Sequence, residues 1–489
     1  MIVQADATSQ DTFETDIAII GGGASGLALA KHLKGDVIVV EAGGPVPNPE
    51  RDALVTFENT GLEMNTQSLR RNLVGGAGAL WSARCAEFDA QDFDPRRAPG
   101  FAGWPISFDT VAPYLQRAWG TVNLDPPTVR WREQIAGLER TLGLPEALEP
   151  QVWQYAFAKE ETPLNLGAHF VPIFEDARKT LLYEADVISL QAEGNALRSV
   201  RILDRAKRTI TLKARRFVLA CGCVENSRIL LDNMDQCDEL LAPVKDNIGR
   251  GFHQHLLIEN EVEAANRKAA SLLQRQLNRM RAPPNASVEF GLRLKTHETE
   301  TDWPLNASAI LRYARSEGIN PLETALLGFS WLRKREPHFI NPDMSFEYSI
   351  EQVPTDTNRI TLSSGRDMLG RRRPSVHWDI SEEELRTTKR LNDTVGRWLE
   401  DQRLGTVSPI EHPKDVLNLS MRDSLHHMGG LRMSETPKTG VVDTDSKVHG
   451  SANLYAVGGA TFPSGGHVNP TLMMFAMAIR LADHFNAQS

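Results

Sequence analysis

A glycine-rich loop near the start of the chain constrains its fold more than any other feature. The apolar run Ile17–Ile20 precedes Gly21-Gly22-Gly23-Ala24-Ser25-Gly26, and apolar positions from Leu27 to Leu33 follow at helical spacing. A second apolar run, Val37–Val40, ends at Glu41. A strand, a Gly-x-Gly-x-x-Gly turn, a helix and a second strand ending in an acid are typical of a dinucleotide-binding βαβ unit. A glycine turn without a ligand does not account for that acid.

Each glycine of this motif, and the acid that follows it, has a physical role. We expect Gly21 to make the tight turn, Gly23 to let a pyrophosphate approach the backbone, and Gly26 to let helix and strand pack. The helix N-terminus supplies amide donors and a positive dipole end. Glu41 is placed to bind a ribose hydroxyl.

The loop alone does not distinguish FAD from NAD. A second small-residue segment, Leu73–Trp81, is suited to run close to a cofactor, although an ordinary surface turn has the same composition. Further glycine-rich segments recur near the C-terminus. FAD is longer than one βαβ unit can hold, so distant segments must return to it, and their presence favours FAD.

Composition excludes several other classes of protein. The chain has 489 residues, which favours two domains, and a net charge of -9, which argues against nucleic acid or an anionic membrane as the main partner. Its four cysteines are too few and too unevenly spaced for a disulfide framework, and no metal-ligand set is evident.

The sequence also carries an expectation about location. The start, Met1–Thr15, has neither a basic nor an apolar signal region, and no apolar run reaches the roughly 20 residues of a membrane span. We therefore expect a cytoplasmic protein without a membrane span. Export together with a signal-bearing partner stays open.

Strand and helix patterns predict an inserted second domain. Alternating strands near 196–213 precede Arg216–Gly222, which we expect to return to the nucleotide sheet. The glycine loops then stop, and alternating strands and two helices, near 266–281 and 383–403, follow up to about residue 420. Arg333-Lys334-Arg335 after Leu326–Leu332 is interpreted as a basic helix end rather than a docking site.

The expected fold class is therefore α/β (α+β overall), a Rossmann-like FAD-binding domain with an inserted antiparallel-sheet substrate-binding domain. We assign the FAD-binding domain to 14–110, 185–256 and 425–489. The substrate-binding domain takes 111–184 and 257–424.

The C-terminal part of the chain carries the candidate chemistry. His426-His427 is followed by Met428-Gly429-Gly430, which permits a tight backbone beside a planar ring. A histidine titrates in the range needed to take a proton from an alcohol while hydride leaves the carbon. The alternatives are a surface histidine pair and metal ligation, for which no third ligand stands nearby.

A second candidate residue stands at the start of the last helix. Asn469 and Pro470 precede an apolar helical pattern over Leu472–Phe485. Asn469 is a good N-cap and Pro470 suits the first turn. Capping does not compete with catalysis, because a helix start presents both its dipole and this side chain to one ligand, and the dipole favours an anionic reduced flavin.

Together these segments resemble the glucose–methanol–choline (GMC) oxidoreductases, FAD-dependent enzymes that oxidise alcohols and sugars. The resemblance extends over the N-terminal loop and the tail from His426, and over Val74–Phe93, Trp104–Ser107, Leu219–Leu231, Asn247–His255 and Asn358–Gly370. It implies that His426 is the base, that Asn469 hydrogen-bonds the substrate hydroxyl, and that His427 is not the base. With Asn rather than His at position 469, the chain resembles the bacterial pyranose-oxidase-like, sugar-oxidising branch of the family.

Three positions depart from the family pattern. Gly430 replaces the usual Thr or Ser, and Gly458-Gly459 stands where an Asp is common near the flavin. Leu80 occupies the position of a flavin-linked His in some pyranose oxidases, so non-covalent FAD is expected. His467 and His427 are candidate substrate contacts, with a structural role for His467 equally open.

The loops and the resemblance together define the predicted cofactor site. Its members are Gly21, Gly23, Ala24, Ser25, Gly26, Glu41, Ala42, Gly75, Gly76, Gly78, Ala79, Leu80, Trp81, Val187, Gly222, Gly459, Ala460, Asn469, Pro470 and Thr471.

The expected substrate is a small alcohol or sugar, a glycoside or polyol among them, and the expected oxidant is oxygen or another electron acceptor. A separate redox partner subunit is also compatible with the sequence. Two alternatives keep the nucleotide loop. One is a flavin-binding electron-transfer subunit or inactive scaffold, supported only by Gly430. The other is a different FAD class, such as an amine oxidase, which does not predict His426 and Asn469 together.

Overall fold

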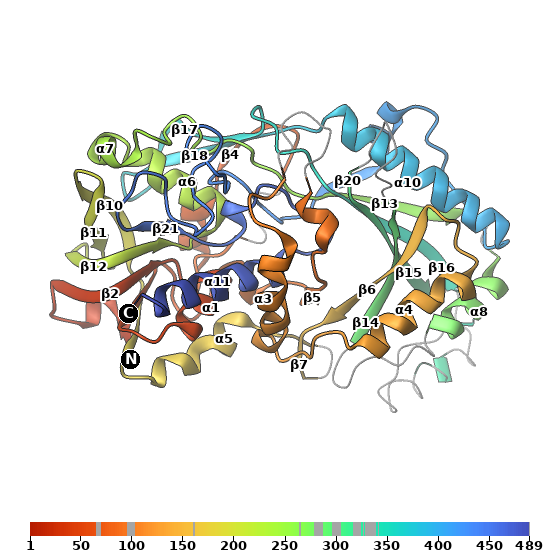
Figure 1. Cartoon of the computed structure of the whole chain (residues 1–489), viewed down its shortest axis with the longest axis horizontal. Coiled ribbons are helices and arrows are strands. Elements are labelled where there is room, and N and C mark those ends of the chain that lie inside the picture. Colours follow the sequence, from red (N-terminus) through yellow and green to blue (C-terminus); the bar gives the residue numbers. More distant parts are fainter. Residues whose placement is uncertain are drawn as a thin grey trace.

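The computed structural model shows two eight-stranded sheets side by side (Figure 1). It describes residues 1–64, 70–94, 103–159, 162–263, 266–277, 287–295, 305–315, 324–325, 327, 339–340 and 342–488. The basic cluster at 333–335 and most of the apolar run before it lie outside these residues, as do positions 278–281 of the helix expected near 266–281.

The first sheet is built around the glycine loop. Its parallel part runs in the order β1 (Ile2–Gln4), β9 (Lys179–Tyr183), β3 (Val37–Glu41), β2 (Thr12–Ile20) and β12 (Thr209–Leu219), with β21 (Leu454–Ala456) also paired to β12. Antiparallel β11 (Ala196–Leu203) and β10 (Asp186–Glu193) extend it. Buried on both faces, Ile17–Ile20 and Val37–Val40 read as continuous apolar runs for that reason.

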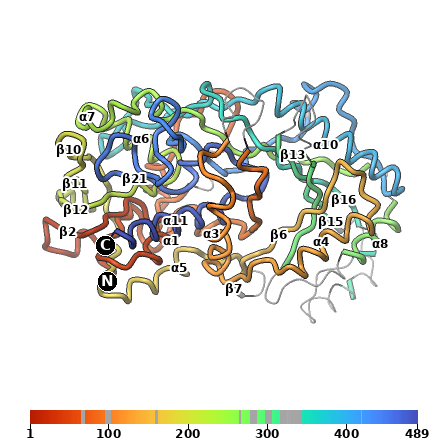
Figure 2. Tube along the Cα trace, viewed as in Figure 1, coloured from red at the N-terminus to blue at the C-terminus, as the bar shows by residue number. Residues whose placement is uncertain are grey.

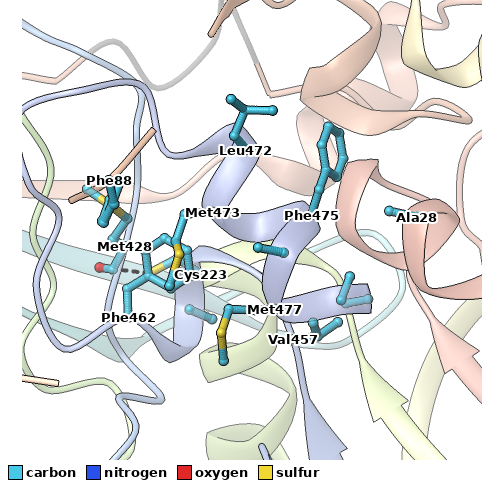
Figure 3. Packing of buried hydrophobic residues seen from close by; sticks show 14 of the residues in the cluster. Ala28, Phe88, Cys223, Met428, Val457, Phe462, Leu472, Met473, Phe475 and Met477 are labelled. Carbon is cyan, nitrogen blue, oxygen red and sulfur yellow. Dashed lines mark hydrogen bonds between the residues drawn. The ribbon is translucent and has the colours of Figure 1, made fainter. Parts of the chain in front are cut away.

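Helices from opposite ends of the chain cover this sheet. α1 (Ala24–His32) follows the glycine loop, and α11 (Thr471–Asn486) lies beside it (Figure 2). Figure 3 shows Phe475 on α11 and Ala28 on the neighbouring α1, and both side chains are fully buried. This packing fixes the start of α11 relative to the glycine loop.

The second sheet is antiparallel, as expected for the inserted domain. Its order is β19 (Thr406–Val407), β13 (Leu256–Glu263), β16 (Pro342–Ile350), β15 (Ala307–Arg315), β14 (Ser287–Leu294), β6 (Leu148–Tyr155) and β5 (Arg84–Cys85), with β20 (Ser420–Asp423) also paired to β13. α10 (Glu382–Asp401) packs on one face, where Asn392 accepts hydrogen bonds from Asn260 and Tyr348. The other face carries charged side chains and meets the site described below.

Four other helices of eight or more residues lie around the two sheets within the described residues. They are α3 (Phe108–Thr121), α4 (Val129–Leu142), α6 (Gly222–Asp232) and α8 (Arg267–Leu277). The shorter ones are α2 (Pro49–Asp52), α5 (Leu166–Phe170) and α7 (Asp238–Leu241). The Ser107 hydroxyl accepts a hydrogen bond from the Thr110 N–H, so Ser107 caps α3. None of the described helices is long and apolar enough to cross a membrane.

The α/β fold class is confirmed, but the predicted domain boundaries differ from the strand pairing. β9 was placed in the substrate domain, yet it pairs with β1 and β3 in the parallel sheet. β5 was placed in the FAD domain, yet it pairs with β6 in the second sheet. β17 (Arg359–Arg366) and β18 (Arg372–Trp378) form a third sheet with β4 (Glu58–Gly61). The strands β9, β5 and β4 are short, and strands distant in the sequence determine which sheet each of them joins. Local sequence patterns do not reveal such pairing.

Candidate active site

The glycine loop has the backbone geometry that a bound pyrophosphate requires. Gly21 has φ +113°, and a Cβ there would lie 2.6 Å from the Ala220 carbonyl carbon. A Cβ on Gly26 would lie 2.1 Å from the Gly21 oxygen, so this position permits the tight packing of turn and helix. At Gly23 the nearest atom would be 3.8 Å away, which leaves the backbone open to a ligand.

Glu41 lies buried beside this loop. Its carboxylate accepts hydrogen bonds from the Gly22 N–H at 2.8 Å and the Gly43 N–H at 2.7 Å. Burial raises the pKa of Glu41 to about 7, although these hydrogen bonds act in the opposite direction. With a pKa near neutrality, Glu41 can accept a hydrogen bond from a ribose hydroxyl when ionised and donate one to it when protonated.

One cavity of about 600 Å³ runs from the glycine loop to His426. Most of the predicted residues line it, namely Gly21, Gly23, Ala24, Ser25, Glu41, Ala42, Gly76, Gly78, Leu80, Trp81, Val187, Gly222, His426, His427, Gly459, Asn469, Pro470 and Thr471. Two segments that are over 400 residues apart in the chain thus share one volume, of the size that cofactor sites have.

Five predicted residues lie outside this lining: Gly26, Gly75, Ala79, Ala460 and His467. Gly26 packs inside the turn, and a Cβ on Gly75 would meet the Gly167 backbone at 2.6 Å. Ala460 is fully buried and its carbonyl accepts from the Leu431 N–H. His467 is buried, and its carbonyl accepts from the Ser349 hydroxyl. Small residues of these segments thus serve backbone packing as well as the cavity.

His426 and Asn469 meet at the far end of the cavity. The Asn469 Nδ2 group lies 3.1 Å from His426 Nε2 and donates to it. Burial, followed by the charges of His255 and Arg84, lowers the pKa of His426 well below its ordinary value. The imidazole is therefore neutral at pH 7, as a proton acceptor must be.

The expected capping role of Asn469 is wrong. α11 begins at Thr471, its cap position is Pro470, and no side chain caps it. The Asn469 amide is turned toward His426 instead. A capping geometry and a site geometry compete for the same short side chain, and only the tertiary structure decides between them.

Sequence reasoning missed His255, which contacts His426. The two Nδ1 atoms lie 2.8 Å apart, and His255 Nε2 donates to the Gly465 carbonyl at 3.1 Å. Burial lowers the pKa of His255 to about 4, so this ring is neutral as well. The available signal was the H-x-H spacing of His253 and His255 within a segment already matched to the family.

Backbone pairing between neighbouring segments holds His255 and His426 together. His253 and Met428 exchange both backbone hydrogen bonds, at 3.0 and 2.8 Å. The Gln254 side-chain oxygen accepts from the N–H groups of Ser424 and Leu425, both at 3.2 Å. Leu425 has φ +61°, an unusual conformation for a branched residue, so Gln254 stabilises the bend that presents His426.

Two of the departures from the family pattern have a local explanation. Gly430 has φ +82°, and a Cβ there would lie 2.5 Å from the Ser227 hydroxyl. Gly458 has φ +99°, and a Cβ there would lie 2.8 Å from the Ser25 hydroxyl. Glycine is thus required by this backbone at both positions, and Gly430 is no sign of lost activity. Leu80 lines the cavity with an apolar side chain, which leaves non-covalent FAD as the prediction.

His427 lies beside the site among aromatic rings. Its ring centroid is 5.4 Å from Phe252 and 6.0 Å from Phe57. Burial lowers the pKa of His427 to about 3. A neutral ring packed against aromatic side chains favours a structural role over the substrate contact that was a candidate from sequence.

Replacing His427 by leucine is expected to change the pH dependence of stability. Below pH 6.5 the unfolded chain protonates this histidine and the folded chain does not, so wild-type stability falls by about 1.4 kcal/mol per pH unit from this group. Between pH 7 and pH 5 the His427→Leu variant should therefore gain about 2 kcal/mol relative to wild type. Urea unfolding at both pH values measures this gain. A difference independent of pH would show that His427 titrates normally in the folded protein.

No three His, Cys, Asp or Glu side chains are arranged to hold a metal ion within the described part of the chain. The four cysteines are free, and Cys223 is buried, with its thiol 3.1 Å from the Gly429 carbonyl. This agrees with a packing role for these small side chains.

A dinucleotide loop joined by one cavity to a histidine–asparagine pair defines a flavin-dependent oxidoreductase. Residues 354–478 match the family model described as GMC oxidoreductase. The chain is 25% identical to paromamine 6'-oxidase of Streptomyces fradiae, over 97% of this chain and 92% of that protein. The chain is thus similar to GMC oxidoreductases along nearly its whole length, and it is an oxidoreductase that acts on CH–OH donors.

Two further comparisons agree with this family. The large subunit of fructose dehydrogenase from Gluconobacter japonicus is 24% identical over 67% of this chain and 55% of that protein. The crystal structure of formate oxidase has the same fold, with a TM-score of 0.66 and 15% identity over 98% of this chain and 99% of that one.

FAD is the cofactor of this family, and the residues present fit it. The backbone is open at Gly23 where a pyrophosphate would approach, and Glu41 is buried where a ribose would lie. The cavity then continues past Trp81 to the start of α11. These groups would hold FAD along its whole length.

Proposed function

We propose that this protein oxidises an alcohol group of a sugar, glycoside or polyol, with His426 as the general base and Asn469 orienting the hydroxyl. The observation that carries the proposal is the contact between His426 Nε2 and Asn469 Nδ2 inside the cavity that begins at the glycine loop. Paromamine 6'-oxidase and fructose dehydrogenase, both named for sugar-like substrates, support this substrate class.

The hydrogen bonds around His255 determine which nitrogen of His426 is basic. The Gly465 carbonyl can only accept, so His255 carries its proton on Nε2. Because the His255 ring is neutral, its Nδ1 has no proton and accepts from His426 Nδ1. His426 Nε2 therefore keeps its lone pair and faces Asn469, in position to take a hydroxyl proton.

The substrate hydroxyl would lie between these two side chains. As its proton moves to His426 Nε2, the Asn469 amide can hold the oxygen and align the C–H bond. When bound, FAD supplies the hydride acceptor, flavin N5. The N-terminus of α11 reaches the cavity at Asn469–Thr471, so its amides and dipole favour negative charge there.

Replacing His255 by phenylalanine is expected to slow flavin reduction by about 10-fold or more, because His426 loses the acceptor that fixes its tautomer. His255→Gln should recover part of the rate, since its amide oxygen can accept from His426 Nδ1. Stopped-flow reduction rates and FAD content are measured for both variants. Equal rates in the two, with FAD retained, would show that His255 is only a packing residue.

The proposed function is tested by the visible spectrum of the purified protein. A flavin band is expected, and at least one member of a panel of sugars, sugar acids, glycosides, polyols and simple alcohols should bleach it without oxygen. Admission of oxygen then distinguishes an oxidase, whose band returns rapidly, from a dehydrogenase that needs another acceptor. A flavin band that no panel member bleaches would contradict the proposal of sugar or polyol oxidation.

A further inference from the structure

The cavity wall opposite the glycine loop carries charges that the proposed mechanism does not use. Arg84 of β5, Arg312 of β15 and Arg422 of β20 all line the cavity together with His426 and Asn469. The strand register places them on the sheet face opposite to α10. These three residues are called the arginine cluster below.

Two glutamates beneath the arginine cluster hold it in place. Glu347 accepts from Arg84 at 3.1 Å and from Arg312 at 2.9 Å, and its other oxygen accepts from Arg422. Glu289 lies 2.8 Å from Arg84 and 3.5 Å from Arg312. The Glu347 side chain is 2% exposed, whereas those of Arg312 and Arg422 are 39% and 51% exposed, so the arginines form the accessible layer.

Three carboxylates pair with the three guanidinium groups of the cluster. Besides Glu347 and Glu289, Glu259 lies 3.7 Å from Arg422; Arg422 is 51% exposed and Glu259 is 57% exposed, so water and salt screen both charges. The arginines also act on His426, because its pKa is lowered by burial first and then by neighbours that include Arg84 and Arg422.

We propose that the arginine cluster binds a carboxylate group of the substrate, so that this enzyme oxidises a sugar acid or a similar hydroxy acid. Guanidinium groups recognise carboxylates through paired, charge-assisted hydrogen bonds. The strands place the cluster near the base: Arg422 precedes His426 by four residues, and Leu257, paired with it, follows His255 by two.

This proposal rests on the alcohol oxidation proposed above, and binding separates the two. The probes are D-gluconate, D-galactonate and D-glucuronate, each paired with its neutral amide, together with glucose 6-phosphate and glucosamine. Dissociation constants are measured by calorimetry on the FAD-loaded protein, and flavin reduction is followed without oxygen. At least one acid should bind tenfold or more tightly than its amide and reduce the flavin at lower concentration.

Arg422→Gln should abolish the preference for the acid over its amide. Arg198→Gln is the matched control. Arg198 is an exposed arginine of β11 that pairs with Glu193 and does not line the cavity, so this substitution should leave the preference intact. The proposal is overturned if no acid is preferred over its amide, if glucose 6-phosphate or glucosamine binds more tightly than every acid, or if the preference survives in Arg422→Gln.

The two proposals fail in different ways. Flavin reduction by neutral sugars without any acid preference would leave alcohol oxidation standing and remove the carboxylate site. An acid preference in binding that depends on Arg422, without flavin reduction by any compound, would support the carboxylate site and count against alcohol oxidation.

Discussion

Replacing His426 by alanine is expected to lower the rate of flavin reduction by roughly 10²–10⁴-fold, the usual contribution of a positioned general base. This corresponds to about 3–5 kcal/mol of activation free energy. The reason is that burial keeps the His426 ring neutral, so Nε2 carries a free lone pair, and Asn469 lies beside that atom. Stopped-flow reduction under saturating substrate measures the change.

Two controls separate chemistry from folding in this variant. His426→Ala should retain FAD, since the glycine loop and Glu41 lie at the opposite end of the cavity. Added imidazole should restore part of the rate, because it can occupy the space left by the ring. A variant that keeps FAD and reduces within a few-fold of wild type would show that another group is the base.

Replacing Gly429 by alanine is expected to destabilise the folded protein by more than about 3 kcal/mol. Gly429 has φ +80°, and a Cβ there would lie 1.9 Å from the Gly251 carbonyl oxygen. Left-handed strain costs about 1–2 kcal/mol for a residue with a side chain, and the clash with backbone adds to it. The free energy of unfolding in urea measures this loss.

Gly370 offers a matched control for Gly429. It has φ +77°, but a Cβ there would meet nothing within 4 Å. Gly370→Ala should therefore cost only the conformational strain, about 1–2 kcal/mol. Equal losses in the two variants would contradict the close approach of Gly251 to the loop that carries His426.

The nucleotide-binding half could be predicted because its signals are local. Ile17–Ile20, the glycine loop and Glu41 lie within one short stretch, and buried parallel strands read as unbroken apolar runs. The start of the last helix was also visible, to within two residues. What local patterns could not decide was whether Asn469 caps that helix or faces His426, because both uses suit the same residue type.

The contacts of His426, the proposed base, were hidden for a related reason. His255 meets His426 only because β13 pairs with β20, a contact between residues 171 positions apart. The arginine cluster likewise comes from three strands that are distant in sequence. Short strands such as β9 and β5 carry too little pattern to show which sheet they join, which is why the predicted domain boundaries differ from the strand pairing.

The most direct test of the account is the pH dependence of anaerobic flavin reduction in wild type and in His426→Ala. Wild type should keep its full rate down to well below pH 6.5 and then lose it as His426 takes up a proton, because burial and nearby cations lower the pKa of this histidine. In His426→Ala that acidic limb should disappear and the residual rate should be flat. An acidic limb of unchanged position in the variant would contradict His426 as the base.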